Sequence, residues 1–206
     1  MASPNVLLVE GHDDLHVIKN LLKRESIDLP IEIIDCGGID PMLERIPVQL
    51  KASGLKILGI VLDADESVSA RFDAIRNILT KSGMSSFPKA PEPNGTIVRE
   101  SDLTVGVWVM PDNVERGKLE DFVALLIEPS DDLKPMVNTA LDEIYRTGVP
   151  RYKTSDRSKA FIHTWLAWQE SPGRPMGLAI TMKYLTASPS VQVSFTNWVG
   201  AVFKNP

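Results

Sequence analysis

The sequence has few of the features that mark secreted or membrane proteins. Cys36 is the only cysteine, so no disulfide can form within the chain, and this scarcity favours the reducing cytoplasm. No apolar run reaches the roughly 20 residues that a membrane-spanning helix needs. No basic stretch precedes the first apolar segment at Val6, so we expect no secretory signal. A glycine-rich ATP-binding loop is also absent, so any ATPase activity has to come from a partner.

The chain does contain enough apolar material for a large core. Its 206 residues are 43% hydrophobic, which suits one large domain or one domain with an added lobe. The formal net charge of -5 is unevenly spread: residues 1–145 carry 14 basic and 25 acidic side chains, whereas residues 146–206 carry eight and two. A basic C-terminal part can bind nucleic acid, or it can simply pack beside the acidic part.

Strand and helix patterns alternate over the first 82 residues. Apolar, β-prone runs at 5–10, 31–35 and 55–62 are each followed by a helical pattern, which predicts right-handed crossovers and a parallel sheet. Further strands are expected at 96–99 and 103–110, the second with alternating burial. We predict an α/β core over residues 1–127 and a helical C-terminal portion, residues 128–206, packed on it. Helices are expected at about 13–25, 40–51, 67–81, 118–127, 133–145, 155–169, 177–185 and 192–203.

Two acidic motifs directly follow two of these predicted strands. Residues 9–14 read Val-Glu-Gly-His-Asp-Asp, and residues 62–66 read Leu-Asp-Ala-Asp-Glu. Open α/β sheets place their sites at the carboxyl ends of the strands, so we expect Glu10, Asp63 and Asp65 to converge. Gathered carboxylates repel one another, and a hard divalent cation is their natural partner. The simpler interpretation of the same acids is solvated side chains at strand ends.

The order and spacing of these motifs, with Gly37-Gly38 between them, resemble the Toprim domain. That domain occurs in topoisomerases, bacterial primases, recombination proteins, overcoming-lysogeny-defect (OLD) nucleases and a small ribonuclease that matures ribosomal RNA. The resemblance covers about residues 1–127 and implies a mostly parallel sheet flanked by helices. With residues 110–113 and 117–121 included, the whole chain is similar to a bacterial family of unknown function with a Toprim-like core.

The resemblance implies an enzyme that depends on Mg²⁺ or Mn²⁺, either a phosphotransferase or a nuclease, and acts on nucleic-acid phosphodiesters. Glu10, Asp63 and Asp65 are the implied catalytic residues, with Glu10 as general acid or base. The implied metal ligands are Glu10, Asp14, Asp63, Asp65 and Glu120, with Asp121 as the alternative to Glu120. Asp14 and Glu120 also suit the first turn of a helix, where an acid interacts favourably with the helix dipole.

Substrate binding is assigned to three glycines near the motifs and to two lysines of the basic C-terminal part: Gly11, Gly37, Gly38, Lys153 and Lys159. A glycine leaves room for a phosphate, although Gly37 and Gly38 equally suit a plain turn. A lysine beside the metals can stabilise the leaving charge, although residues 151–159 equally suit a solvated helix entry. The pI of about 5.3 predicts weak, salt-sensitive and metal-dependent binding to DNA or RNA.

Two other functions remain open from the sequence. The chain could be a non-catalytic Toprim-like module that binds nucleic acid or a protein partner such as an ATPase. It could also be a receiver-like phosphoacceptor, with Asp63 as the modified residue. A topoisomerase is disfavoured, because all three tyrosines, Tyr145, Tyr152 and Tyr184, lie in the C-terminal part and no tyrosine-bearing cleavage domain is recognisable.

Overall fold

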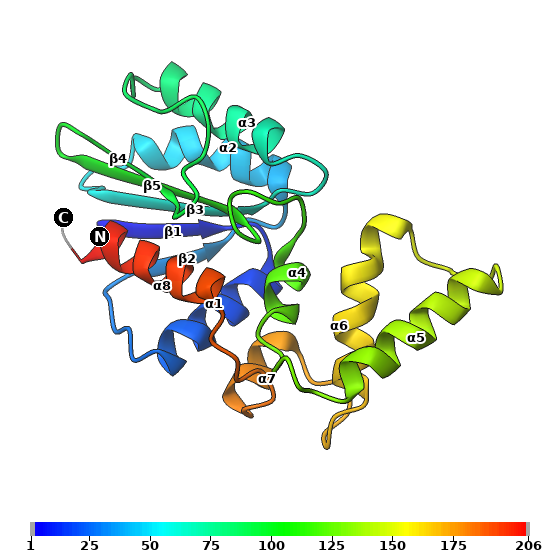
Figure 1. The fold of residues 1–206 in the computed structure, drawn as a ribbon. Helices are drawn as coiled ribbons and strands as arrows, with labels where there is room; N and C mark the ends of the chain where they lie inside the picture. The colour runs from blue at the N-terminus through cyan, green and yellow to red at the C-terminus, as the bar shows by residue number, and fades with distance from the viewer. Residues whose placement is uncertain (1–2, 205–206) are drawn as a thin grey trace.

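A five-stranded sheet lies at the centre of the computed structural model, which describes residues 3–204 (Figure 1). The strand order is β2-β1-β3-β5-β4, and all neighbours are parallel except the antiparallel pair β4 and β5. The predicted α/β class with a mostly parallel sheet is therefore confirmed. The strands are β1 Asn5–Val9, β2 Glu32–Asp35, β3 Ile57–Asp63, β4 Thr96–Glu100 and β5 Leu103–Met110.

The strand order differs from the 2-1-3-4-5 order of flavodoxin-like sheets, to which receiver domains belong. Here β5 lies between β3 and β4, and β4 runs in the opposite direction to its neighbour. This topology disfavours the receiver-like alternative.

Strand β5 is buried along almost its whole length. Seven of its eight residues are buried, so the alternating burial expected for residues 103–110 is wrong. The reason is its central position: β5 lies between two other strands, and helices cover both faces of the sheet. A strand covered on both faces is apolar at successive positions instead of alternating.

Two helices cover each face of the sheet (Figure 1). Leu7 and Val9 of β1 belong to the same apolar cluster as residues of α1 (His12–Arg24) and α8 (Ser190–Phe203). Val6 and Leu8 instead belong to the cluster that contains residues of α2 (Ile39–Leu50) and α3 (Val68–Lys81). This division follows the two-residue period of a strand, in which neighbouring side chains point to opposite faces.

Helix α8 approaches the sheet very closely over two glycines. A Cβ atom on Gly59 would lie 2.9 Å from the ring of Phe203, and one on Gly106 would lie 2.5 Å from a methyl group of Val202. The absence of side chains at these two positions therefore lets α8 pack directly on β3 and β5. Because of this contact, the last helix of the chain forms part of the central layers rather than of a separate lobe.

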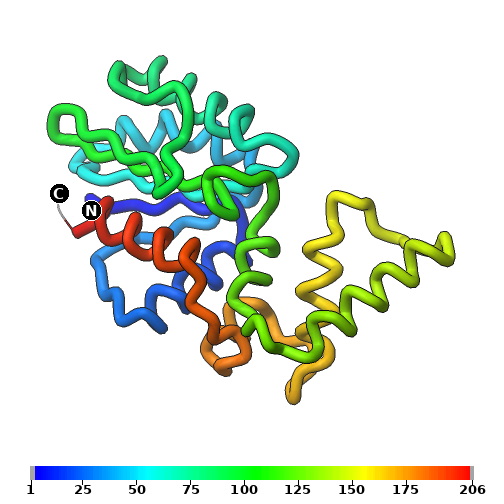
Figure 2. The backbone as a smooth tube through the Cα atoms, viewed as in Figure 1, coloured from blue at the N-terminus to red at the C-terminus, as the bar shows by residue number. Residues whose placement is uncertain are grey.

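Two helices form an arm that extends away from the sheet (Figures 1 and 2). We call residues 133–167 the arm; it contains α5 (Leu133–Arg146), the short 3₁₀ turn η1 (Thr154–Asp156) and α6 (Arg157–Ala167). Helix α6 packs against α4 (Leu119–Ala124), which follows the central sheet, and α7 (Met176–Thr181) packs against α1. The helical C-terminal portion thus contributes both an arm and a covering layer.

Within residues 3–204, no helix is long and apolar enough to cross a membrane.

Candidate functional site

Glu10 and Asp63 come together because β1 and β3 are adjacent and in register. Val9 pairs with Val61 across the parallel strands, so the residues that follow lie at the same edge of the sheet. The backbone N–H of Asp63 donates a hydrogen bond of 3.1 Å to Oε2 of Glu10. The expected convergence of these two acids at the carboxyl ends of the strands is thereby seen directly.

Asp14 turns back toward the same edge from the first turn of α1. Its Oδ2 accepts a hydrogen bond of 3.1 Å from the backbone N–H of Gly11, and the residue is only 7% exposed. Its other oxygen, Oδ1, is buried and has no hydrogen-bond partner among the described residues. A buried carboxylate oxygen without a donor is costly, so this atom is suited to an added cation or proton.

Asp63 connects the strand ends to helix α4. Its Oδ1 accepts a hydrogen bond of 2.9 Å from the backbone N–H of Leu119, the first residue of α4. This bond brings the neighbouring Glu120 to the site, where it is 7% exposed and lies 3.6 Å from Nζ of Lys159. Asp121 has a different task, because its Oδ2 accepts a hydrogen bond of 2.8 Å from the N–H of Lys118. Of the two alternatives, Glu120 is therefore the acid that joins the cluster.

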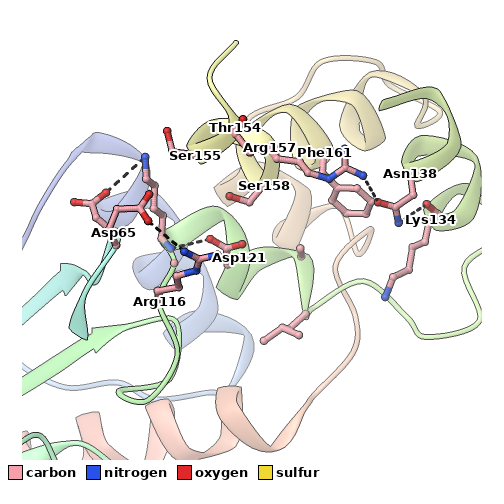
Figure 3. A pocket seen from close by; sticks show the side chains of 15 residues that line it. Asp65, Arg116, Asp121, Lys134, Asn138, Thr154, Ser155, Arg157, Ser158 and Phe161 are labelled. Atoms are coloured by element: carbon pink, nitrogen blue, oxygen red, sulfur yellow. Dashed lines mark hydrogen bonds and ion pairs between the residues drawn. The ribbon is translucent and has the colours of Figure 1, made fainter. Parts of the chain in front are cut away.

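Asp65 lies at the edge of the site and is held by two cations. It has a left-handed backbone with φ of 49°, and its N–H and C=O both bond to Gly117, at 2.8 and 3.0 Å. Its carboxylate forms ion pairs with Arg71 and, at 3.6 Å, with Lys118. Figure 3 shows Asp65 beside the loop that carries Arg116. Asp65 is thus neutralised within the protein, unlike Asp14 and Asp63, for which no ion pair is found among the described residues.

We call Glu10, Asp14, Asp63 and Glu120 the acidic cluster. Burial, followed by the negative charges of Asp14, Glu10 and Glu120, raises the pKa of Asp63 to about 9. Burial and the charge of Glu10 raise the pKa of Asp14 to about 7. Burial also raises the pKa of Glu10. Without an added cation, the cluster therefore retains protons near neutral pH.

The acidic cluster fits a hard divalent cation in the chemistry of its donors. It offers carboxylate oxygens, which Mg²⁺ and Mn²⁺ prefer, and one of them is the unpartnered Oδ1 of Asp14. The side chains are not gathered around one point: within residues 3–204, no three His, Cys, Asp or Glu side chains are arranged to hold a metal ion. Binding a cation therefore requires the carboxylates to rotate toward it.

The three glycines predicted to bind substrate lie near the acidic cluster but have their own structural tasks. Gly11 precedes α1 and donates its N–H to Asp14. Gly37 and Gly38 have φ of 77° and 123° and form the turn between β2 and α2. Their N–H groups bond to Asp35 and to the carbonyl of Glu10, at 2.8 Å each. These bonds place both residues in the turn, and their contact with a substrate stays a prediction.

The two predicted lysines occupy different places. Lys159 extends from α6 of the arm to Glu120 of the acidic cluster. Lys153 is exposed just before η1 and is not among the residues that line the neighbouring cleft. The basic residues that the sequence did not single out are Arg71 and Lys118, which hold Asp65. For Lys118, the sequence gave one indication: Asp121 follows it by three residues, a spacing that is typical of the start of a helix.

Comparisons with known proteins give one family and a distant structural likeness. A family model described as "Protein of unknown function (DUF3226)" matches residues 4–204. No curated protein matches the sequence. The C-terminal region of the OLD protein of Xanthomonas campestris pv. campestris, solved with mercury phasing, is similar over 96% of this chain and 94% of its own, with 16% identity and a TM-score of 0.48. The structure of that region phased with platinum gives 15% identity, 96% and 92% coverage and a TM-score of 0.46.

Proposed function

This chain belongs to the DUF3226 family, and we propose that it is a phosphotransferase or nuclease that acts on nucleic-acid phosphodiesters with Mg²⁺ or Mn²⁺. The observation that carries the proposal is the buried acidic cluster, in which two aspartates have strongly raised pKa values and one buried oxygen has no partner. Strongly perturbed acids that meet at the carboxyl ends of parallel strands are typical of functional sites. The sequence resemblance to the Toprim domain points to the same chemistry.

The proposed metal ligands are Glu10, Asp14, Asp63 and Glu120, with Asp65 at the edge. A bound divalent cation would neutralise charge on the phosphate and favour the deprotonated form of the acids around it. Glu10, Asp14 and Asp63 are each oriented by a backbone N–H that donates to the carboxylate. Arg71 and Lys118 keep positive charge beside Asp65, where it can attract a phosphate oxygen.

Glu10 is the proposed general acid or base. Hydrolysis forms a bond between a water oxygen and phosphorus and breaks the bond from phosphorus to the leaving oxygen. As a carboxylate, Glu10 can accept the proton of the water; in its protonated form it can donate a proton to the leaving oxygen. Burial raises the pKa of Glu10, which brings it closer to neutral pH, where a group can serve both roles.

The test is cleavage of labelled single- and double-stranded DNA and RNA in the presence of Mn²⁺ or Mg²⁺. We expect wild-type protein to cleave at least one of these substrates and Asp63→Asn to cleave none. Asp102→Asn is the matched control, because Asp102 is an exposed acid in the β4–β5 turn at the opposite end of the sheet. Cleavage that persists in Asp63→Asn, in protein free of contaminating nuclease, would refute the proposal.

One observation favours a second function, a non-catalytic module that works with a partner protein. Asp65 already has two cationic partners, and the described acids are not arranged around a common point. A site used only as a scaffold needs no divalent cation. Thermal unfolding separates the two functions: Mn²⁺ should raise the Tm of wild-type protein but not that of Asp63→Asn if the cluster binds metal. An unchanged Tm in both, with no cleavage, would favour the scaffold.

A further inference from the structure

A cleft of about 680 Å³ adjoins the acidic cluster, between the loop before α4 and the arm (Figure 3). Arg116, Lys118 and Asp65 line it on the side of the sheet, and Lys134, Arg157 and Phe161 line it on the side of the arm. Asp65 is therefore shared by the cleft and by the edge of the acidic site, two residues from Asp63. Whatever the cleft holds lies next to the proposed catalytic acids.

We propose that this cleft binds one strand of a nucleic acid, with phosphates against its basic side chains and an unpaired base against Phe161. The inference deepens the proposed function, on which it rests, by naming the form of the substrate and the residues that hold it. Neither Lys153 nor Lys159 lines this cleft, but Arg157 does, and it belongs to the basic stretch 151–159 that the sequence suggested for a phosphate backbone.

The charge of the cleft favours a phosphate backbone. Four basic and three acidic side chains line it, whereas the whole chain has a formal net charge of -5. The lining acids are engaged: Glu66 pairs with Arg116 at 3.4 Å, Asp121 accepts the N–H of Lys118, and Asp65 is also held by Arg71 from outside the cleft. Basic side chains therefore outnumber acidic ones in the lining by one, so the cleft is less acidic than the chain as a whole and phosphate contacts can form there.

The arm supplies two of the four basic side chains that line the cleft. Arg157 pairs with Asp142 of α5 at 2.7 Å, but the Asp142 side chain is 70% exposed, so this ion pair is weak and exchangeable. Lys134 takes part in none of the ion pairs found among the described residues of the cleft. The hydroxyl-bearing residues Thr154 and Ser155 lie beside them and are exposed, which adds neutral donors for phosphate oxygens.

The size of the cleft suits a single strand. Its volume lies in the range of pockets that take small molecules, which matches a short segment of one strand. Phe161 packs against the apolar core but also lines the cleft, beside Arg157 in Figure 3, so an unpaired base can stack on the part of its ring that faces the cleft.

Fluorescence anisotropy in EDTA tests the cleft independently of catalysis. The probes are labelled single-stranded DNA, single-stranded RNA and a duplex of the same sequence. We expect tighter binding of a single strand than of the duplex, and a loss of about tenfold for Lys134→Ala/Arg157→Ala, with a shallower salt dependence. The matched control is Lys51→Ala/Lys81→Ala, which removes two exposed lysines at the ends of α2 and α3 and should bind as wild type does.

Asp142→Ala is a second variant that tests the proposal even if the double variant Lys134→Ala/Arg157→Ala unfolds the arm. This change removes the partner of Arg157 without removing a basic group, so the single strand should bind tighter, by about threefold. Unchanged affinity in the folded double variant, or a preference for the duplex, would overturn the proposal. The two proposals can fail separately. If the cleft variants weaken binding but the wild-type protein cleaves nothing, only the proposed catalytic function is refuted. If the wild-type protein cleaves nucleic acid and the cleft variants cleave it equally well, only the cleft proposal is refuted.

Discussion

The acidic cluster and the adjoining cleft differ in how they hold charge. In the cluster, the acids are buried and close together, and burial and mutual repulsion raise the pKa values of Asp14 and Asp63. In the cleft, charges of both signs lie at or near the surface and pair with one another, as Arg157 does with Asp142. The two regions meet at Asp65, whose side chain is 31% exposed.

This difference shows where stability and function conflict. Buried like charges oppose folding, so the cluster is not explained by stability and points to a ligand that compensates it. Exposed ion pairs contribute little, typically 0–1 kcal/mol, so the charges of the cleft can change with little effect on the fold. Substitutions in the acidic cluster should therefore lower activity and raise stability, whereas substitutions in the cleft should change ligand binding with little effect on stability.

The largest effect is expected from Asp63→Asn, which should change activity and stability in opposite directions. Cleavage should fall by at least about 100-fold, equivalent to about 2.7 kcal/mol of transition-state stabilisation. The metal-free variant should nevertheless unfold at a higher temperature than wild type, because asparagine still accepts the N–H of Leu119 but does not have to take up a proton when the chain folds at neutral pH. Calorimetry in EDTA measures this, and a lower Tm would contradict the view that the cluster opposes folding.

The pH dependence of stability should distinguish the cluster from the rest of the surface. The pKa values of Asp63 and Asp14 are about 9 and about 7 in the folded protein, above the ordinary aspartate value of about 3.9. The folded protein therefore retains protons that the unfolded chain releases. The resulting stability is complete below pH of about 4 and is lost as the pH rises toward 9, by up to about 1.4 kcal/mol per pH unit for each retained proton.

Urea titrations of metal-free protein between pH 5 and pH 9 provide the measurement. The double variant Asp14→Asn/Asp63→Asn should show a flatter profile, because two of the linked groups are gone. A wild-type stability that rises over this pH range would show that these acids are ionised in the folded state.

A smaller effect is expected from Asp65→Asn, which affects the residue shared by both regions. The change removes ion pairs with Arg71 and Lys118 that are partly exposed, so the free energy of unfolding should fall by no more than about 1 kcal/mol. Cleavage should fall as well, whereas single-strand binding in EDTA should be retained or should tighten. Chemical denaturation and anisotropy measure the two quantities, and weaker binding would place Asp65 in a different role.

The smallest effect is expected from Lys159→Ala. Lys159 lies 3.6 Å from Glu120 but its side chain is 57% exposed, so the change should alter the free energy of unfolding by about 0.5 kcal/mol or less. Lys183→Ala serves as a comparison, since it removes a basic residue at the end of α7 instead of one beside the cluster. A loss of several kcal/mol in Lys159→Ala alone would mean that this lysine compensates Glu120 as a buried partner does.

The positions of Glu10 and Asp63 could be predicted from the sequence because each follows an apolar run that forms a strand, and parallel strands end at one edge. Asp14 also followed from local order, as an acid in the first helical turn. The roles of Arg71 and Lys118 could not be predicted in this way. They reach the site only through the placement of α3 and α4, which depends on contacts between residues far apart in the chain.

The close packing of α8 on the sheet has a practical consequence. Asn5 pairs with Ile57 at the end of the sheet opposite Asp63, and Phe203 at the end of α8 lies against Gly59 in the middle of β3. Figures 1 and 2 show the start of β1 and the end of α8 side by side, away from the arm. A purification tag, a fluorophore or a surface tether can therefore be attached at either end without covering the cleft.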